Sequence, residues 1–167
     1  MANFVVRGPF KISRYKGKGA RLITKENAKQ FWHVHKKYAK RRGCYVCGVR
    51  AARGYKPGYV GKTKKSLEQE AFTDRNLNLY NQFMADREKG TPVMFFVLMD
   101  AQRGKPNNKR IREVEKYLIN LGFTANPDLL NKQDKKANDW GIRGVVRGGK
   151  GKTSAGTKSF RRMMGIE

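Results

Sequence analysis

The chain has 167 residues, and its 38 lysines and arginines against 13 acidic residues give a formal net charge of +25. The length fits one domain with a modest core, and no apolar run reaches the roughly 18 residues that a membrane-spanning helix needs. Because basic side chains release counterions when they contact phosphates, nucleic acid is the expected partner, and a membrane surface is the runner-up.

The charge divides the chain into three parts. Residues 1–43 hold 13 basic residues and one acidic residue, residues 44–131 hold 15 and nine, and residues 132–167 hold 10 and three. We therefore expect a folded domain over 44–131, a basic N-terminal extension over 1–43 and a basic C-terminal tail over 132–167. The opening residues lack the pattern of a secretory signal, so we expect a cytoplasmic or nucleic-acid-associated compartment and no secretion.

The N-terminal extension contains one predicted helix. Thr24 can cap it, apolar residues recur at helical spacing to about Arg42, and Gly43 is a stop signal. Basic residues cover the rest of this helix, as a solvated face or, given the charge of the whole chain, as a phosphate-binding one.

The central part follows the order strand, turn, strand, helix, strand, helix. "CYVCGVR" and "GYVGK" predict two paired strands, and "VMFFVLM", Val93 to Met99, predicts a strand that is covered on both faces. Ser66 starts a capping box for a long helix to about Lys89, and an apolar stripe from Ile111 to Leu121 predicts a second helix. The expected fold is α/β, with a small three-stranded antiparallel sheet flanked by helices.

The tail mixes glycine, lysine and arginine with few large apolar residues, so we expect it to be flexible until it meets a partner. Trp140, Phe160 and Tyr55 could stack on unpaired bases, although packing is the commoner role of such residues. The residues expected to contact phosphates are Lys36, Lys37, Lys40, Arg41, Arg42, Lys64, Lys65, Arg143, Arg147, Lys150, Lys152, Lys158, Arg161 and Arg162.

Several common sites are excluded by spacing. "GKT" occurs twice, but the glycine that a phosphate-binding P-loop needs five positions earlier is Lys56 in one case and Val146 in the other. Cys44 and Cys47 form a single CxxC on a predicted strand, where their side chains would point to opposite faces, so we expect free thiols and no zinc site.

The remaining motifs resemble the GIY-YIG endonuclease family. Gly43-Cys44-Tyr45 is similar to the GIY element, Tyr59-Val60-Gly61-Lys62-Thr63 to the YIG element, and Glu115-Lys116-Tyr117-Leu118-Ile119 to the helix that carries the family's glutamate. Asn131 falls where the family often has a late asparagine. The resemblance covers about residues 43–131, and the predicted order of strands and helices agrees with the family's fold.

The resemblance implies roles for four residues. Glu115 would hold one divalent metal ion, most plausibly Mg²⁺, and Tyr45 would act as or position a general base. Tyr59 would orient water or substrate. Because a free tyrosine has a pKa of about 10, Tyr45 would need a nearby cation such as Lys62 to work near neutral pH.

One position departs from the family. Where its members carry an arginine that stabilises the phosphate, "SLEQEAF" places Glu70, and a carboxylate repels a phosphate. Arg75 is expected to point elsewhere, and Arg112 lies near Glu115 on the same helix face. Two functions therefore stay open: a metal-dependent endonuclease, and a catalytically inactive DNA- or RNA-binding module such as a structural component of a ribonucleoprotein particle.

Overall fold

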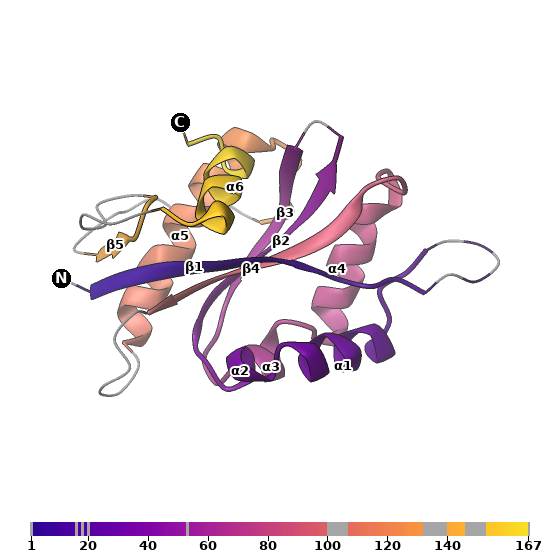
Figure 1. Cartoon of the computed structure of the whole chain (residues 1–167), viewed down its shortest axis with the longest axis horizontal. Coiled ribbons are helices and arrows are strands. Elements are labelled where there is room, and N and C mark those ends of the chain that lie inside the picture. The colour runs from indigo at the N-terminus through magenta and orange to yellow at the C-terminus, as the bar shows by residue number, and fades with distance from the viewer. Residues whose placement is uncertain are drawn as a thin grey trace.

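A computed structural model describes residues 2–15, 17, 19, 21–52, 54–99, 107–131, 140–145 and 153–166. These residues form one mixed sheet with helices on both faces (Figure 1). The strands are β1 (Ala2–Lys11), β2 (Gly43–Ala51), β3 (Gly54–Lys62), β4 (Thr91–Met99) and β5 (Trp140–Ile142). The helices are α1 (Lys25–Val34), α2 (Lys36–Ala39), α3 (Leu67–Glu70), α4 (Asp74–Ala85), α5 (Asn108–Ala125) and α6 (Ala155–Met163).

The three predicted strands are adjacent in the sheet, with β3 at its edge and β4 at its centre. β2 and β3 make an antiparallel hairpin, and β2 also pairs antiparallel with β4, where Tyr45 lies opposite Phe96. Val93 to Leu98 are buried, as predicted for a strand that is covered on both faces. The α/β class and the central hairpin are thus confirmed.

The sheet is larger than the predicted three strands, and this prediction is wrong. The strand order is β3-β2-β4-β1-β5, with β1 antiparallel to β4 and the short β5 parallel to β1. β1 comes from the segment that the charge pattern assigned to an extension. Phe4, Val5 and Val6 are all buried, so this short apolar run forms part of the core despite its basic neighbours.

Side chains alternate between two buried layers, because successive residues of a strand point to opposite faces. One layer lies under α5 and α6 and includes Cys44, Val46 and Val60. The other lies against α1 to α4 and includes Tyr45 and Cys47. This separation decides where the candidate catalytic residues fall.

The helix starts are as predicted, but their lengths differ. Thr24 caps α1 through the backbone N–H of Asn27, and Ser66 caps α3 through that of Gln69. The predicted long helix from Ser66 to about Lys89 is wrong, because the chain breaks after α3 and Thr73 starts α4 with a new cap. The break resets the helical phase, so α3 and α4 present different faces.

The C-terminal part was predicted to be flexible, and for α6 this is wrong. Phe160, Met163 and Met164 are at most 1% exposed and belong to the layer under α5. Gly156 allows α6 to approach β1 closely, since a Cβ there would lie 1.9 Å from the Gly8 carbonyl oxygen. Three large side chains at helical spacing are enough to dock this helix on the sheet.

None of the helices in the described ranges is both long and apolar enough to cross a bilayer.

Candidate functional site

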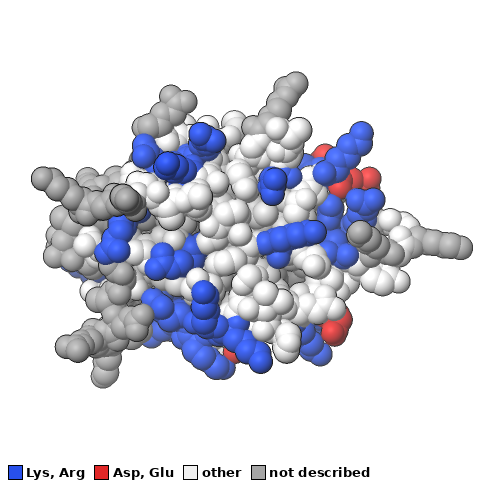
Figure 2. Space-filling model, viewed as in Figure 1, with Lys and Arg blue, Asp and Glu red and all other residues white. Residues whose placement is uncertain are grey.

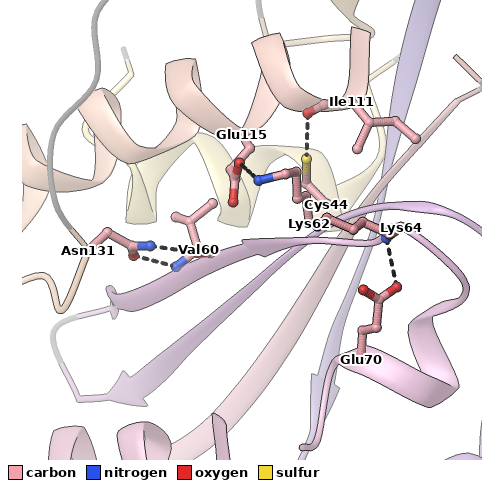
Figure 3. A network of polar contacts seen from close by, with 8 residues as sticks. All are labelled: Cys44, Val60, Lys62, Lys64, Glu70, Ile111, Glu115 and Asn131. Atoms are coloured by element: carbon pink, nitrogen blue, oxygen red, sulfur yellow. Dashed lines mark hydrogen bonds and ion pairs between the residues drawn. The ribbon is translucent and has the colours of Figure 1, made fainter. Parts of the chain in front are cut away.

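The predicted metal-binding residue forms an ion pair between the edge strand and α5. The Lys62 ammonium nitrogen lies 2.5 Å from Glu115 Oε2, and the two side chains are 28% and 15% exposed. Next to this pair the buried Cys44 thiol donates to the carbonyl oxygen of Ile111 at 3.4 Å (Figure 3). Lys62, which the resemblance placed near Tyr45, instead pairs with Glu115, 53 positions away in the sequence.

Asn131 has a structural role at the same edge. Its side-chain amide accepts from the Val60 N–H and donates to the Val60 carbonyl, both at 2.7 Å (Figure 3). The side chain thereby pairs with β3 as a neighbouring strand would. This contact holds the segment after α5 against the edge of the sheet.

The two tyrosines lie on the opposite face from the ion pair. Tyr45 is opposite Gly61 and Tyr59 is opposite Cys47, whereas Lys62 is opposite Cys44 on the α5 side. The rings of Tyr45 and Tyr59 are 6.5 Å apart between centroids. The four predicted catalytic residues thus surround the β2–β3 hairpin without sharing one face of it.

The Tyr45 hydroxyl is buried and fully hydrogen-bonded. It donates to the Glu70 carbonyl oxygen at 3.2 Å and accepts from Asn76 Nδ2 at 2.8 Å. Burial raises the pKa of Tyr45 well above its usual range, and the nearby Tyr59 raises it further. A phenol held in its neutral form by this environment is not poised to act as a base near neutral pH, so the role implied by the resemblance does not fit this geometry.

The buried phenols and thiols predict alkaline destabilisation. Burial raises the pKa values of Tyr45, Tyr80, Cys44 and Cys47 above their ordinary values of 10.0 and 9.0. From about pH 9 upward the unfolded chain releases these protons while the folded chain keeps them, so stability falls as pH rises.

The urea midpoint should therefore decrease between neutral pH and about pH 10.5. The Tyr45→Phe variant should show a shallower decrease. Tyr15→Phe, which removes a 62% exposed side chain, is the matched control and should follow the parent protein. A midpoint that stays constant over this range would contradict the prediction.

Glu70, at the position of the family's arginine, binds backbone instead of facing a substrate. Its Oε2 accepts from the backbone N–H of Lys64 at 2.7 Å (Figure 3) and from that of Lys65 at 2.6 Å. The carboxylate thus fixes the loop between β3 and α3. Glu70 therefore has a structural role in this loop, and its carboxylate keeps the negative charge that is expected to repel a phosphate.

Replacing Glu70 should loosen this loop. We expect Glu70→Ala to lower the free energy of unfolding by about 1 kcal/mol, since two charge-assisted hydrogen bonds at a partly exposed site are lost. The control is Glu68→Ala, which removes only an exposed ion pair with Lys40 and should have little effect. Urea unfolding measures both variants, and equal losses would contradict the role of Glu70.

Arg75 is exposed near the start of α4. Burial raises the pKa of Tyr59, the charge of Arg75 lowers it in part, and the charge of Glu115 raises it. The guanidinium therefore lies within electrostatic reach of the Tyr59 hydroxyl. The break before α4 was missed, because one continuous helix was predicted from Ser66 to about Lys89. The sequence "TDRN" after Phe72 was the signal for a new helix start, because Thr73 can cap a helix through the backbone N–H of Asn76.

The residues as they stand do not form a magnesium site. Glu115 offers one carboxylate, and its Oε2 already contacts the Lys62 ammonium, which would repel a divalent cation. Within the described part of the chain, no three His, Cys, Asp or Glu side chains gather as a metal cluster. Magnesium stays a prediction that a cleavage experiment tests.

The predicted phosphate-binding residues form two separate groups. The first consists of the basic residues of α2, of the turn before β2 and of the β3–α3 loop, and we call it the basic surface: Lys36, Lys37, Lys40, Arg41, Arg42, Lys64 and Lys65. The second lies with β5 and α6 on the other side of the sheet: Arg143, Lys158, Arg161 and Arg162. Arg147, Lys150 and Lys152 lie outside the described residues.

Figure 2 shows lysine and arginine side chains gathered in the lower part of the view, where Figure 1 draws α2 and α3.

Comparisons of the chain with protein-family models, curated proteins and solved structures gave no match.

Proposed function

We propose that the protein binds nucleic acid through the phosphate backbone and that the basic surface makes the principal contacts. The observation that supports this most is the convergence of its seven cationic side chains from three segments of the chain. Five of them are exposed lysines and two are partly buried arginines. Each phosphate that such a surface neutralises releases counterions and contributes affinity.

The scaffold of the basic surface is held by specific contacts. Arg42 Nη2 donates to the carbonyl oxygen of Lys64 and, at 2.7 Å, to Asn108 Oδ1. The backbone N–H of Leu67 donates to the Arg41 carbonyl at 2.9 Å. The loop that carries Lys64 and Lys65 is thus tied to the turn before β2, so these cations are presented at a defined position.

The acidic residues nearby leave most of this charge unneutralised. Glu68 pairs with Lys40 at 2.7 Å, and Glu70 is bound to the loop backbone. In the described part of the chain, no acidic side chain forms an ion pair with Lys36, Lys37, Lys64 or Lys65. These four exposed lysines, of which Lys37 lies over the Tyr38 ring, give the surface a positive potential that attracts anionic partners.

The experiment is a salt titration of the binding of a labelled oligonucleotide to the whole chain. If the seven cations contact phosphates, the logarithm of the affinity should fall linearly with the logarithm of salt concentration, with a slope of about −5 to −6. No binding at low salt would overturn the proposal, and binding with a slope near zero would exclude a backbone-centred mode.

Phosphodiester cleavage is the second candidate function, and one observation favours it. Glu115 and Lys62 meet at 2.5 Å at the edge strand, and the charges of Arg75 and Glu115 both influence the pKa of Tyr59 on the other face of that strand. Arg75 would then take the role of the family's missing arginine. Such a cluster could orient a phosphate and its attacking water at the edge strand.

Cleavage of plasmid DNA and of mixed RNA in added magnesium tests this candidate. If the cluster is catalytic, Arg75→Ala and Glu115→Gln should each abolish cleavage and leave oligonucleotide binding within about twofold, since neither belongs to the basic surface. Lys109→Ala, an exposed cation on α5, is the control for nonspecific loss of charge. Binding without cleavage by the parent protein would support the inactive module.

A further inference from the structure

A groove next to the basic surface has no role in the function proposed so far. It measures about 850 Å³, which lies in the range of ligand pockets. One wall comes from α1 and α2, and the other from α3, the chain between α3 and α4, and the first residue of α4. Lys36 and Lys40 belong both to the groove and to the basic surface, so the two are continuous.

The floor of the groove is apolar and contains a hydrogen-bond donor without an acceptor. Trp32 and Phe72 line it together with two alanines, and their rings meet at right angles, with centroids 6.0 Å apart. Trp32 is 8% exposed, and its Nε1 has no partner in the described part of the chain. Buried N–H groups are almost always paired in folded proteins, so an acceptor supplied by a ligand is the natural partner.

The rim of the groove carries four lysines. Lys25 pairs with Asp74 at 2.9 Å and Lys40 with Glu68 at 2.7 Å, each joining one wall to the other. These bridges are largely exposed and therefore weak, so phosphates can compete for both lysines. Lys29 and Lys36 have no ion pair among the described residues.

We propose that this groove binds an unpaired base of a single-stranded nucleic acid. The base lies against Phe72 on the apolar floor and accepts a hydrogen bond from Trp32 Nε1, while Lys29 and Lys36 contact the flanking phosphates. One face of the Trp32 ring is already stacked on Phe96, at an interplanar angle of 6°, and its N–H is buried without a partner among the described residues. This inference rests on the proposed nucleic-acid binding and names the class of nucleic acid.

The groove favours a single strand over two other partners. In a duplex the bases are stacked and paired, and they cannot enter a groove between helices. An acidic peptide would satisfy the lysines, but its carboxylate side chains offer no flat apolar surface to Phe72 and the alanines. A nucleotide combines a flat ring, hydrogen-bond acceptors and a phosphate, which match the floor, the indole N–H and the rim in turn.

The test combines fluorescence with affinity. The chain has two tryptophans, so a Trp140→Phe variant of the whole chain reports on Trp32 alone. We expect its emission to change when a single-stranded oligouridylate or oligothymidylate of about 16 nucleotides is added, and to stay constant with a duplex of the same length. Polyglutamate serves as the acidic peptide probe.

The affinities of substituted chains distinguish binding in the groove from an effect of the total charge. In a chain with its native Trp140, Trp32→Phe should weaken single-strand binding by about 5- to 10-fold and duplex binding by less than about twofold. Lys29→Ala/Lys36→Ala does not disturb the core and should weaken single-strand binding more than Lys11→Ala/Lys56→Ala, which removes the same charge from exposed positions on β1 and β3.

The outcomes separate two questions: whether the groove binds a base, and whether the protein binds nucleic acid at all. Single-strand binding with no change in Trp32 emission, or equal loss from the two double variants, overturns the groove and leaves nucleic-acid binding intact. A response to polyglutamate and none to the oligonucleotides assigns the groove to an acidic peptide and overturns the base site. Failure of every nucleic acid to bind at low salt overturns the proposed function itself.

Discussion

Phe160→Ala should lower the free energy of unfolding by about 3 to 5 kcal/mol, the usual cost of truncating a fully buried aromatic residue. Phe160 lies on α6, in the segment whose composition predicted a flexible tail, yet its side chain is 0% exposed. Its ring contacts that of Phe95 on the central strand β4, with centroids 5.3 Å apart. Truncation leaves a cavity between α6 and the sheet that neighbouring side chains fill only in part.

Urea-induced unfolding of the whole chain measures the loss, and Lys158→Ala is the matched control. Lys158 is exposed on the same helix, so its removal should change stability by less than about 0.5 kcal/mol. If both variants unfold like the parent protein, α6 is not part of the core. If Phe160→Ala alone is destabilised, deletion of residues 132–167 removes core packing as well as charge, and such a deletion cannot measure the contribution of the tail to binding.

The segments at the two ends of the chain show why charge is a poor guide to the limits of a domain. Their basic residues predicted extensions, but burial depends on a few apolar side chains at the right spacing. In β1 these are Phe4 to Val6, and in α6 they are Phe160, Met163 and Met164. Each run is too short to predict burial by itself. Whether it is buried depends on a partner strand or layer that is distant in the sequence.

The central hairpin was predictable because its signals are local. Turn residues separate two strand-like runs, and the continuous apolar stretch of β4 indicated a strand covered on both faces. The helix break after α3 was missed, because the cap at Thr73 competes with an apolar pattern that continues through it.

At the candidate site the sequence predicted which residues take part, but not how they pair, how deeply they are buried or which hydrogen bonds they form. Lys62 was expected beside Tyr45, but it pairs with Glu115 on the other face of the hairpin. The burial of the Tyr45 hydroxyl and the binding of Glu70 to backbone N–H groups could not be predicted. Both depend on the path of the loop between β3 and α3, and protonation and hydrogen bonding follow from that path.

Removing four lysines from the basic surface should weaken nucleic-acid binding by about 100-fold or more at low salt, because about four phosphate contacts are lost. The variant Lys36→Ala/Lys37→Ala/Lys64→Ala/Lys65→Ala changes exposed side chains only, so the fold should remain intact. The slope of log affinity against log salt should become less negative by about 3, and this change reports the number of contacts directly.

The control keeps the same loss of charge but places it elsewhere. Lys11→Ala/Lys56→Ala/Lys89→Ala/Lys109→Ala removes four lysines from β1, β3, the loop after α4 and α5, all outside the basic surface. If binding depends only on the total charge of the chain, both variants should lose affinity and salt dependence equally. A larger loss for the first variant, with unchanged urea midpoints for both, would place the phosphate contacts on α2 and the β3–α3 loop, next to the groove of Trp32.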